Sequence, residues 1–87
     1  MNYDIELSRI ALKSLAKIPR RELLRIKDKI DALSLEPRPT DTKKIHCDEN
    51  LYRIRIGNYR VLYRIFDDKI LVLIVDVDHR KDIYKGL

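Results

Sequence analysis

The stretch LYRIRIGNYRVLYRIF, residues 51–66, contains four arginines and no acidic residue. The arginines are Arg53, Arg55, Arg60 and Arg64. A guanidinium group can bind a phosphate through two parallel hydrogen bonds, so clustered arginines are typical of a site for phosphate or another anion. The apolar residues between them alternate as in a β-strand, which indicates that a sheet positions this charge.

The dipeptide Gly57-Asn58 lies between two alternating runs and predicts a two-residue hairpin turn. In that register Arg55 faces Arg60 across the hairpin, Arg53 faces Leu62, and Leu51 faces Arg64. The arginines then share one face of the sheet. The other face is expected to pack on helices and is formed by Tyr52, Ile54, Ile56, Tyr59, Val61 and Tyr63.

Two explanations fit an all-positive strand face. A solvated face tolerates charge of any kind, although such faces usually mix both signs. Like charges directly opposite one another destabilise a strand pair, so a small domain gains nothing from them unless an anion binds there. We therefore favour an anion site.

The C-terminal stretch VDVDHRKDIYKGL adds His79, Arg80 and Tyr84 just beyond a strand, where we expect them near the arginines. Histidine transfers protons near neutral pH, and tyrosine can stack on a nucleobase. With the arginines they would form a group able to cleave a phosphodiester. The alternative is that His79 is a surface residue and Tyr84 a core anchor.

The remaining pattern predicts an α+β domain of order β-α-α-β-β-β, with an N-terminal helical hairpin on one face of a small antiparallel-type sheet. Residues 2–7 alternate as a strand, Ser8 can cap a first helix, and Pro19 suits the start of a second. The stretch EPRPTDTKK is expected to be a loop. The last three strands are expected at residues 51–57, 58–66 and 69–77, and the whole chain, residues 1–87, forms one domain.

The outer, arginine-bearing side of this sheet is also predicted to be apolar. If Asp67-Asp68 is a two-residue turn, the final strand adds apolar residues to that side, and either the chain's own C-terminus or a partner must cover them. The residues concerned are Leu62, Leu71, Leu73, Val75 and Val77.

Composition narrows the class of protein. The 87 residues carry 19 Lys and Arg against 14 Asp and Glu, a net charge of +5 that suits a polyanion or an acidic protein as partner. No apolar run is long enough to span a bilayer, and the N-terminus does not resemble a signal peptide, so we expect a cytoplasmic protein without a membrane partner. His46, His79 and Cys47 lack the spacing of a zinc site, so no metal or cofactor is predicted.

The segments YRIRIGNYRVLY and HRKDIY closely resemble the RelE/ParE superfamily of toxins, on the RelE side. The resemblance extends over essentially the whole chain and implies a small sheet backed by two helices. It also implies a ribosome-dependent endoribonuclease that cleaves messenger RNA in the ribosomal A site by 2′-hydroxyl attack, without a metal. Its partners would be the ribosome, the mRNA and a cognate antitoxin, which we expect to be acidic, to carry an amphipathic helix, and to form a hetero-oligomer with the toxin.

The resemblance implies a role for each residue of the site. Arg53 and Arg55 correspond to two basic strand residues, Arg60 to the arginine that binds the transition state, Arg80 to the proposed general acid, and Tyr84 to the stacking tyrosine. The two strand residues are lysines in the best-known bacterial member. Because arginine holds its proton too tightly to act as an ordinary base, His79 is a candidate proton carrier. Further RNA contacts are expected from Arg64, Lys43, Lys44 and Lys81, and antitoxin contacts from Leu62, Leu71, Leu73 and Val75.

Two other functions fit the same fold. One is a ParE-like toxin that inhibits DNA gyrase and cuts no RNA, and the other is a non-catalytic module that only binds an antitoxin. The presence of the basic strand residues together with Arg60, Arg80 and Tyr84 argues against the ParE-like function. The non-catalytic module stays open, and growth arrest on expression would separate it from the toxins.

Overall fold

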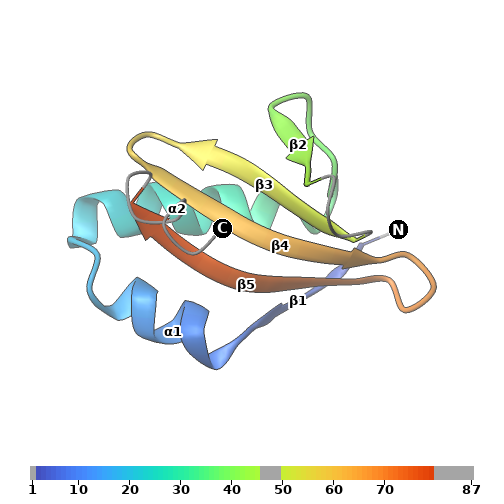
Figure 1. Ribbon diagram of the computed structural model, residues 1–87, viewed down its shortest axis with the longest axis horizontal. Helices are drawn as coiled ribbons and strands as arrows, with labels where there is room; N and C mark the ends of the chain where they lie inside the picture. The colour runs from blue at the N-terminus through green and yellow to red at the C-terminus, as the bar shows by residue number, and fades with distance from the viewer. Residues whose placement is uncertain (1, 46–49, 80–87) are drawn as a thin grey trace.

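The computed structural model describes residues 2–45 and 50–79. The elements are β1 (Asp4–Leu7), α1 (Arg9–Ala16), α2 (Arg20–Ala32), β2 (Thr42–Lys44), β3 (Leu51–Ile56), β4 (Tyr59–Phe66) and β5 (Leu71–His79). The predicted α+β class and N-terminal helical hairpin are confirmed (Figure 1).

The strands form one five-stranded sheet in the order β1-β5-β4-β3-β2. β1 pairs with β5 in parallel, and the other neighbours are antiparallel. The expectation of a loop throughout EPRPTDTKK is wrong, because residues 42–44 form β2 and pair with residues 52–54 of β3. This extra edge strand brings Lys43 beside the predicted arginine face.

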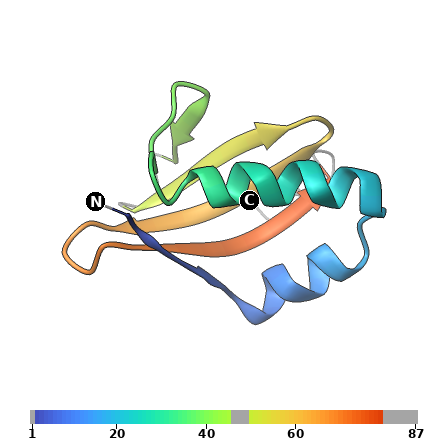
Figure 2. The same cartoon turned by 180° about the vertical axis from the view of Figure 1, so that it is seen from behind.

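α2 lies across one face of the sheet, and α1 lies against the β5 side of the molecule (Figures 1 and 2). The core lies between the helices and the sheet, with Tyr63 its largest fully buried side chain. Its buried members are Ala11, Ile26, Ile30, Leu33, Ile54, Ile56, Val61, Tyr63, Ile65, Val72, Ile74 and Val77. We call the side of the sheet turned away from α2 the outer face. None of the helices in the described residues is long and apolar enough to cross a membrane.

Ser8 fixes the start of α1, as predicted. Its hydroxyl oxygen accepts a hydrogen bond from the Ala11 backbone N–H at 3.0 Å, and the hydroxyl donates to the Val75 carbonyl at 2.6 Å. β1 pairs only with residues 71–74 of β5. Beyond Ile74, β5 is contacted by α1 instead, where Ser14 Oγ donates a hydrogen bond to Asp76 Oδ1 at 3.0 Å.

The β3–β4 hairpin has the predicted register. Ile56 pairs with Tyr59, Arg55 with Arg60, and the two-residue turn contains Gly57 at φ +60°. A residue with a Cβ rarely adopts this left-handed conformation, so the glycine permits the tight turn.

The predicted β4–β5 connection is wrong in two respects, its length and the strand register that follows it. Phe66 pairs with Leu71, so the connection has four residues, and Ile70 lies at φ 51°. The register then shifts at Val75, because Tyr63 pairs with Ile74 while Leu62 pairs with Asp76. A β-bulge of this kind reverses which side chains point to which face. Val77 is therefore buried against Val61 on the helix side, and not on the outer face as expected.

Candidate active site

A hollow of about 280 Å³ opens on the outer face, and we call it the arginine hollow. Asp41, Lys43, Arg53, Arg55 and Arg60 line it. Four of these five residues are cationic, so the hollow suits a phosphate or another polyanion.

Strand register brings these side chains together. Lys43 of β2 pairs with Arg53 of β3, and Arg55 of β3 pairs with Arg60 of β4. Directly paired residues in a sheet have Cβ atoms about 4.5–5.5 Å apart. The predicted convergence of Arg53, Arg55 and Arg60 is confirmed as a matter of geometry.

Arg60 differs from its neighbours in being buried, with 5% of its surface exposed, whereas Arg55 is exposed. A buried charge is costly unless polar or charged groups surround it. The β5 residue paired with Arg60 is Asp78, so Arg60 sits between a like charge on one side and a carboxylate on the other. The sequence reading placed no acid on this face, and the bulge at Val75 is the reason it was wrong.

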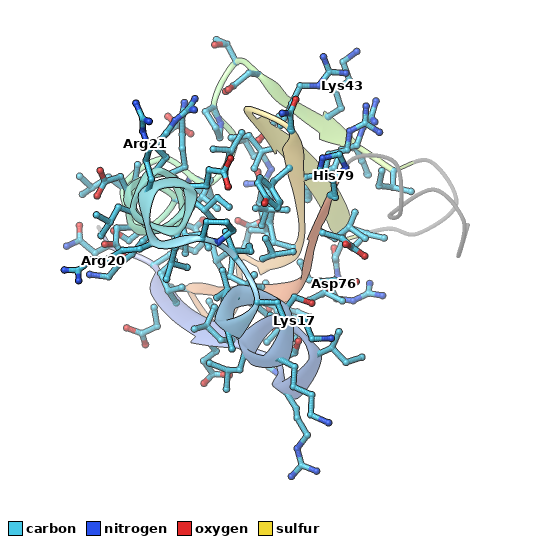
Figure 3. All side chains as sticks on the ribbon, turned by 90° about the vertical axis from the view of Figure 1, so that its left-hand side faces the viewer. Lys17, Arg20, Arg21, Lys43, Asp76 and His79 are labelled. Atoms are coloured by element: carbon cyan, nitrogen blue, oxygen red, sulfur yellow. The ribbon has the colours of Figure 1, made fainter. Side chains whose placement is uncertain are left out.

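The other described residues predicted to contact RNA do not line the arginine hollow with Lys43. Arg64 is on the outer face opposite Leu51 and Leu73, but it does not line the arginine hollow. Lys44 pairs with Tyr52 and so belongs to the helix-side face, away from Lys43. Lys81 lies outside the described residues. Figure 3 shows Lys43 on the far side of the molecule from Arg20 and Arg21 of α2.

The expected location of His79 is wrong. His79 pairs with Tyr59, and the two rings meet edge to face with centroids 5.6 Å apart. Tyr59 in turn donates a hydrogen bond to Glu22 of α2 at 3.3 Å, which identifies this as the helix side of the sheet. The bulge thus turns His79 away from the arginines. Arg80 and Tyr84 lie outside the described residues.

The predicted antitoxin-binding residues largely share the outer face. Leu62, Leu71 and Leu73 are half-buried there, next to Arg64. Val75 lies at the bulge and has no direct partner on β4. An apolar strip therefore runs beside the arginines, and it is shorter than expected because Asp76 and Asp78 follow it on the same face.

Sequence reasoning missed Asp41, the carboxylate that lines the arginine hollow. Its Oδ2 lies 3.6 Å from Lys29 Nζ of α2, and both side chains are about half exposed. Asp41 and Lys43 are two residues apart, which is the spacing of side chains on one face of a strand. Reading TDTKK as an extended strand instead of a loop would have placed Asp41 beside Lys43, which was already predicted to contact RNA.

A polar network anchors β2 to the rest of the sheet. The Tyr63 hydroxyl donates to the Pro37 carbonyl at 2.9 Å and lies 2.5 Å from Thr42 Oγ1, and burial raises the pKa of Tyr63 to about 12. Arg38 donates to both oxygens of Asp67 at 3.2 and 2.8 Å and to the Tyr52 hydroxyl at 3.2 Å. The hydrogen bond from Arg38 lowers the pKa of Asp67. Lys43 and Asp41 are thereby held beside the arginines.

Comparison with known proteins identifies the family. Residues 5–84 match the family model described as the ParE toxin of the type II toxin–antitoxin system, parDE. The chain belongs to the RelE/ParE toxin family. The toxin RelG of Mycobacterium tuberculosis is 35% identical over 86 residues, covering 98% of this chain and 99% of RelG. The toxin RelE3 of Methanocaldococcus jannaschii is 38% identical over 77 residues, covering 84% and 85% of the two chains.

The three-dimensional likeness agrees with the RelE branch. The crystal structure of the archaeal RelE–RelB complex from Pyrococcus horikoshii contains a chain that superposes with a TM-score of 0.83 at 28% identity, covering 94% of this chain and 99% of that one. This protein is thus a RelE-like toxin of a toxin–antitoxin system.

Proposed function

We propose that this RelE-like toxin is a metal-independent endoribonuclease that cleaves mRNA in the ribosomal A site and so inhibits translation. The observation that carries the proposal is the arginine hollow, in which Arg53, Arg55, Arg60 and Lys43 converge from three strands. The family membership of the chain supports it, because the RelE resemblance assigns RNA cleavage to residues at these positions.

The chemistry needs few protein groups. The 2′ oxygen of the RNA attacks the adjacent phosphorus, the bond from phosphorus to the 5′ oxygen breaks, and the products are a 2′,3′-cyclic phosphate and a 5′ hydroxyl. Negative charge builds on the phosphorane, and guanidinium donors aimed at it lower the barrier. Arg60 suits this role because its burial restricts its motion, while the exposed Arg55 and the half-buried Arg53 neutralise the flanking phosphate oxygens.

A proton must leave the 2′ hydroxyl. Arginine is a poor acceptor, and His79 lies on the helix side of the sheet. Among the described residues that line the hollow, Asp41 is the carboxylate. We assign it as the proton acceptor, while Arg80 and Tyr84 keep the roles that the resemblance gives them, protonation of the 5′ oxygen and stacking on a base.

A cognate antitoxin is proposed to hold the toxin inactive. The apolar strip of Leu62, Leu71, Leu73 and Val75 beside the arginines fits a partner with apolar and acidic residues, such as an amphipathic helix. RelB antitoxins accompany the structurally similar RelE chains in their complexes. Arg64 and Lys43 would contact RNA once the antitoxin leaves.

Inhibition of DNA gyrase is the second candidate, because the matching family model is named for ParE. Single-turnover cleavage of mRNA on programmed ribosomes separates the two. We expect the parent to cleave, and Arg55→Ala and Arg60→Met to cleave about a hundred- to a thousandfold more slowly, the usual loss when a donor to developing charge is removed. Methionine is chosen at position 60 because alanine would leave a cavity at a buried site.

The control variant is Arg9→Ala, which removes one positive charge at an exposed position of α1 and should cleave at the parental rate. A parent that arrests growth and blocks supercoiling without cutting mRNA would establish the gyrase function instead. A parent that does neither would leave a non-catalytic antitoxin-binding module.

A further inference from the structure

A second hollow, of about 510 Å³, lies between α2 and the end of β3, and we call it the α2 hollow. Its lining includes Arg25, Asp28, Lys29 and Ala32 of α2 and Arg55 and Ile56 of β3. β2 begins level with Ile54, so within residues 2–45 and 50–79 no strand pairs with this edge of β3 at Arg55 and Ile56. The hollow opens beside this uncovered edge.

The α2 hollow continues the charge of the arginine hollow, because Arg55 lines both. Its other cations are Arg25 and Lys29, against one acid, Asp28. Lys29 also forms an ion pair with Asp41, with 3.6 Å between Lys29 Nζ and Asp41 Oδ2. Because both side chains are about half exposed, this ion pair is weak and leaves Lys29 accessible. The two hollows therefore form one basic path around the end of the sheet.

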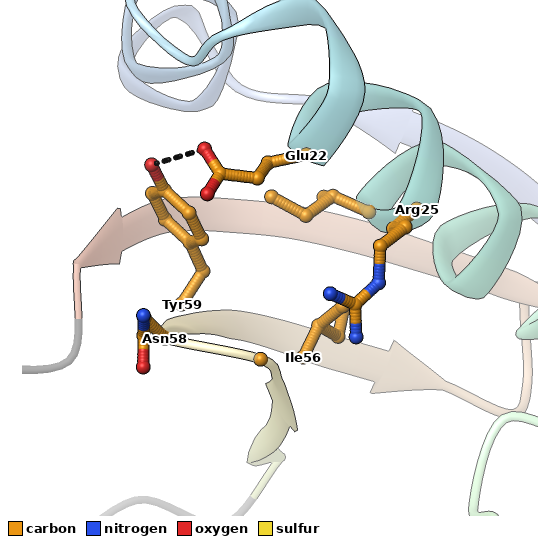
Figure 4. A pocket seen from close by; sticks show the side chains of 7 residues that line it. Glu22, Arg25, Ile56, Asn58 and Tyr59 are labelled. Carbon is orange, nitrogen blue, oxygen red and sulfur yellow. Dashed lines mark hydrogen bonds between the residues drawn. The ribbon is translucent and has the colours of Figure 1, made fainter.

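Arg25 lies against Gly57 of the β3–β4 turn in this path. A Cβ on Gly57 would lie 3.5 Å from the nearest guanidinium nitrogen of Arg25, so the guanidinium rests directly on the turn. Figure 4 shows Arg25 extending from α2 toward the β3–β4 hairpin, while Glu22 on the same helix is hydrogen-bonded to Tyr59. Arg25 and Arg55 thus flank one turn, from the helix and from the sheet.

We propose that the α2 hollow is a second phosphate-binding site, in which Arg25 and Lys29 contact the RNA backbone on one side of the scissile phosphate. The inference rests on the proposed endoribonuclease function. An open groove lined by a run of cations is typical of nucleic-acid backbone contacts, whereas the buried core of a protein interface is depleted of charge.

The test is binding to ribosomes over a salt series. The probe is a ribosome programmed with mRNA carrying 2′-deoxynucleotides in the A-site codon, which cannot be cleaved. We expect the double variant Arg25→Gln/Lys29→Gln to bind at least tenfold more weakly, with a salt slope reduced by about one unit per lost contact. Asp28→Asn, which removes the acid from the hollow, should bind more tightly than the parent.

The matched control is Arg9→Gln/Lys27→Gln, which removes the same charge from exposed positions that do not line this hollow. Ribosomes without mRNA give the second arm. A defect that appears only with mRNA places the messenger in the hollow, and a defect in both arms places ribosomal RNA there. Either supports a phosphate site, and only the first supports its position beside the scissile phosphate.

Two outcomes overturn the proposal. If the parent cleaves mRNA but the Arg25/Lys29 variant matches the control in affinity and salt slope, the hollow does not bind RNA and only this inference fails. If that variant instead loses only antitoxin affinity, the hollow belongs to the antitoxin interface. A parent that neither binds nor cuts on ribosomes refutes the proposed function as well, so the two failures are distinct.

Discussion

The Tyr63 hydroxyl is a single group whose removal should loosen β2 without disturbing the core. The side chain is fully buried, its hydroxyl donates to the Pro37 carbonyl at 2.9 Å, and it also meets Thr42 Oγ1. Tyr63→Phe keeps the ring, including its stacking on Tyr52 at a centroid distance of 6.0 Å. It leaves the buried Pro37 carbonyl without this donor.

The expected cost follows from those two lost bonds. A buried polar group left without its partner costs about 1–3 kcal/mol. No cavity term adds to this, because only one oxygen is removed. For a domain of this size each kcal/mol lowers the Tm by roughly 4–8 °C. We therefore expect Tyr63→Phe to lower the Tm by about 4–24 °C.

Tyr59→Phe is the matched control. Its hydroxyl makes a longer bond, 3.3 Å to Glu22, at a half-buried position, so we expect a change within about 0.5 kcal/mol. Thermal and urea unfolding followed by circular dichroism measure both variants. Equal losses in the two would refute the view that the Tyr63 hydroxyl anchors β2.

Alkaline titration gives a second measure of the same hydroxyl. Burial raises the pKa of Tyr63 to about 12, above the value of about 10 for tyrosine in an unfolded chain. A raised pKa stabilises the folded state below pH 10, and that contribution is lost as the pH rises through 12. Tyr63→Phe should remove this late step from tyrosine absorbance, and Tyr59→Phe should leave it in place.

Three shorter predictions follow from the site and its supports. Asp41→Asn should bind programmed ribosomes more tightly yet cleave at least about a hundredfold more slowly at saturation, as loss of a general base requires; unchanged or faster cleavage would mean that Asp41 only offsets charge. Arg38 lowers the pKa of Asp67, so the Arg38–Asp67 pair stabilises the folded state above the pKa of aspartate in the unfolded chain, near 4. This stabilisation is lost as the pH falls through the lower pKa of Asp67 in the folded state, and the acid unfolding of Asp67→Asn should therefore lack this pH-dependent loss. Ser8→Ala removes the cap of α1 and a bond to β5, and urea unfolding should show a loss of about 0.5–2 kcal/mol. The control is Lys17→Ala, at an exposed position just after α1, which should leave the free energy of unfolding within about 0.5 kcal/mol of the parent.

Local signals predicted the parts of the fold that local interactions determine. Alternation and Gly57-Asn58 gave the β3–β4 register because a two-residue turn leaves little freedom in pairing. Ser8 was predictable as a cap because its acceptor role involves only the next turn of helix. The convergence of Arg53, Arg55 and Arg60 follows from that register alone.

The β4–β5 connection could not be predicted in the same way. Asp67-Asp68 has turn-forming composition, but the chain turns over four residues and places the β-branched Ile70 at positive φ, a conformation that such residues strongly disfavour. The hydrogen bonds from Lys69 and Asp4 to Phe66 and Ile70 carbonyls, and the Arg38–Asp67 pair, belong to this turn. Several of these partners are distant in sequence, so no local rule reveals them.

The bulge at Val75 explains why the charge of the outer face was misread. Side chains of a strand alternate between its two faces. If alternation starts from the apolar Leu71, the odd-numbered residues of β5 lie on the outer face. If it starts from the polar Asp76 and Asp78, the even-numbered residues lie there. Both counts hold only if the strand carries one extra residue, and the structure has that residue at Val75. A polar pair that breaks the alternation of an otherwise apolar strand was therefore the available signal.

The extra residue at Val75 also determines which side chains of β5 reach each face of the sheet. It buries Val77 and sends His79 to Tyr59 on the helix side, and it delivers Asp76 and Asp78 to the outer face. Asp76 accepts hydrogen bonds from Ser14 of α1 and the Val77 backbone N–H. Asp78 accepts one from the His79 backbone N–H and lies across from the buried Arg60. A carboxylate in that position lies beside Arg60 in the sheet, while Arg53 and Arg55 line the same hollow from β3. The bulge thus lets the sheet bury one arginine of the site opposite an acidic residue, while Arg55 stays exposed where a phosphate would bind.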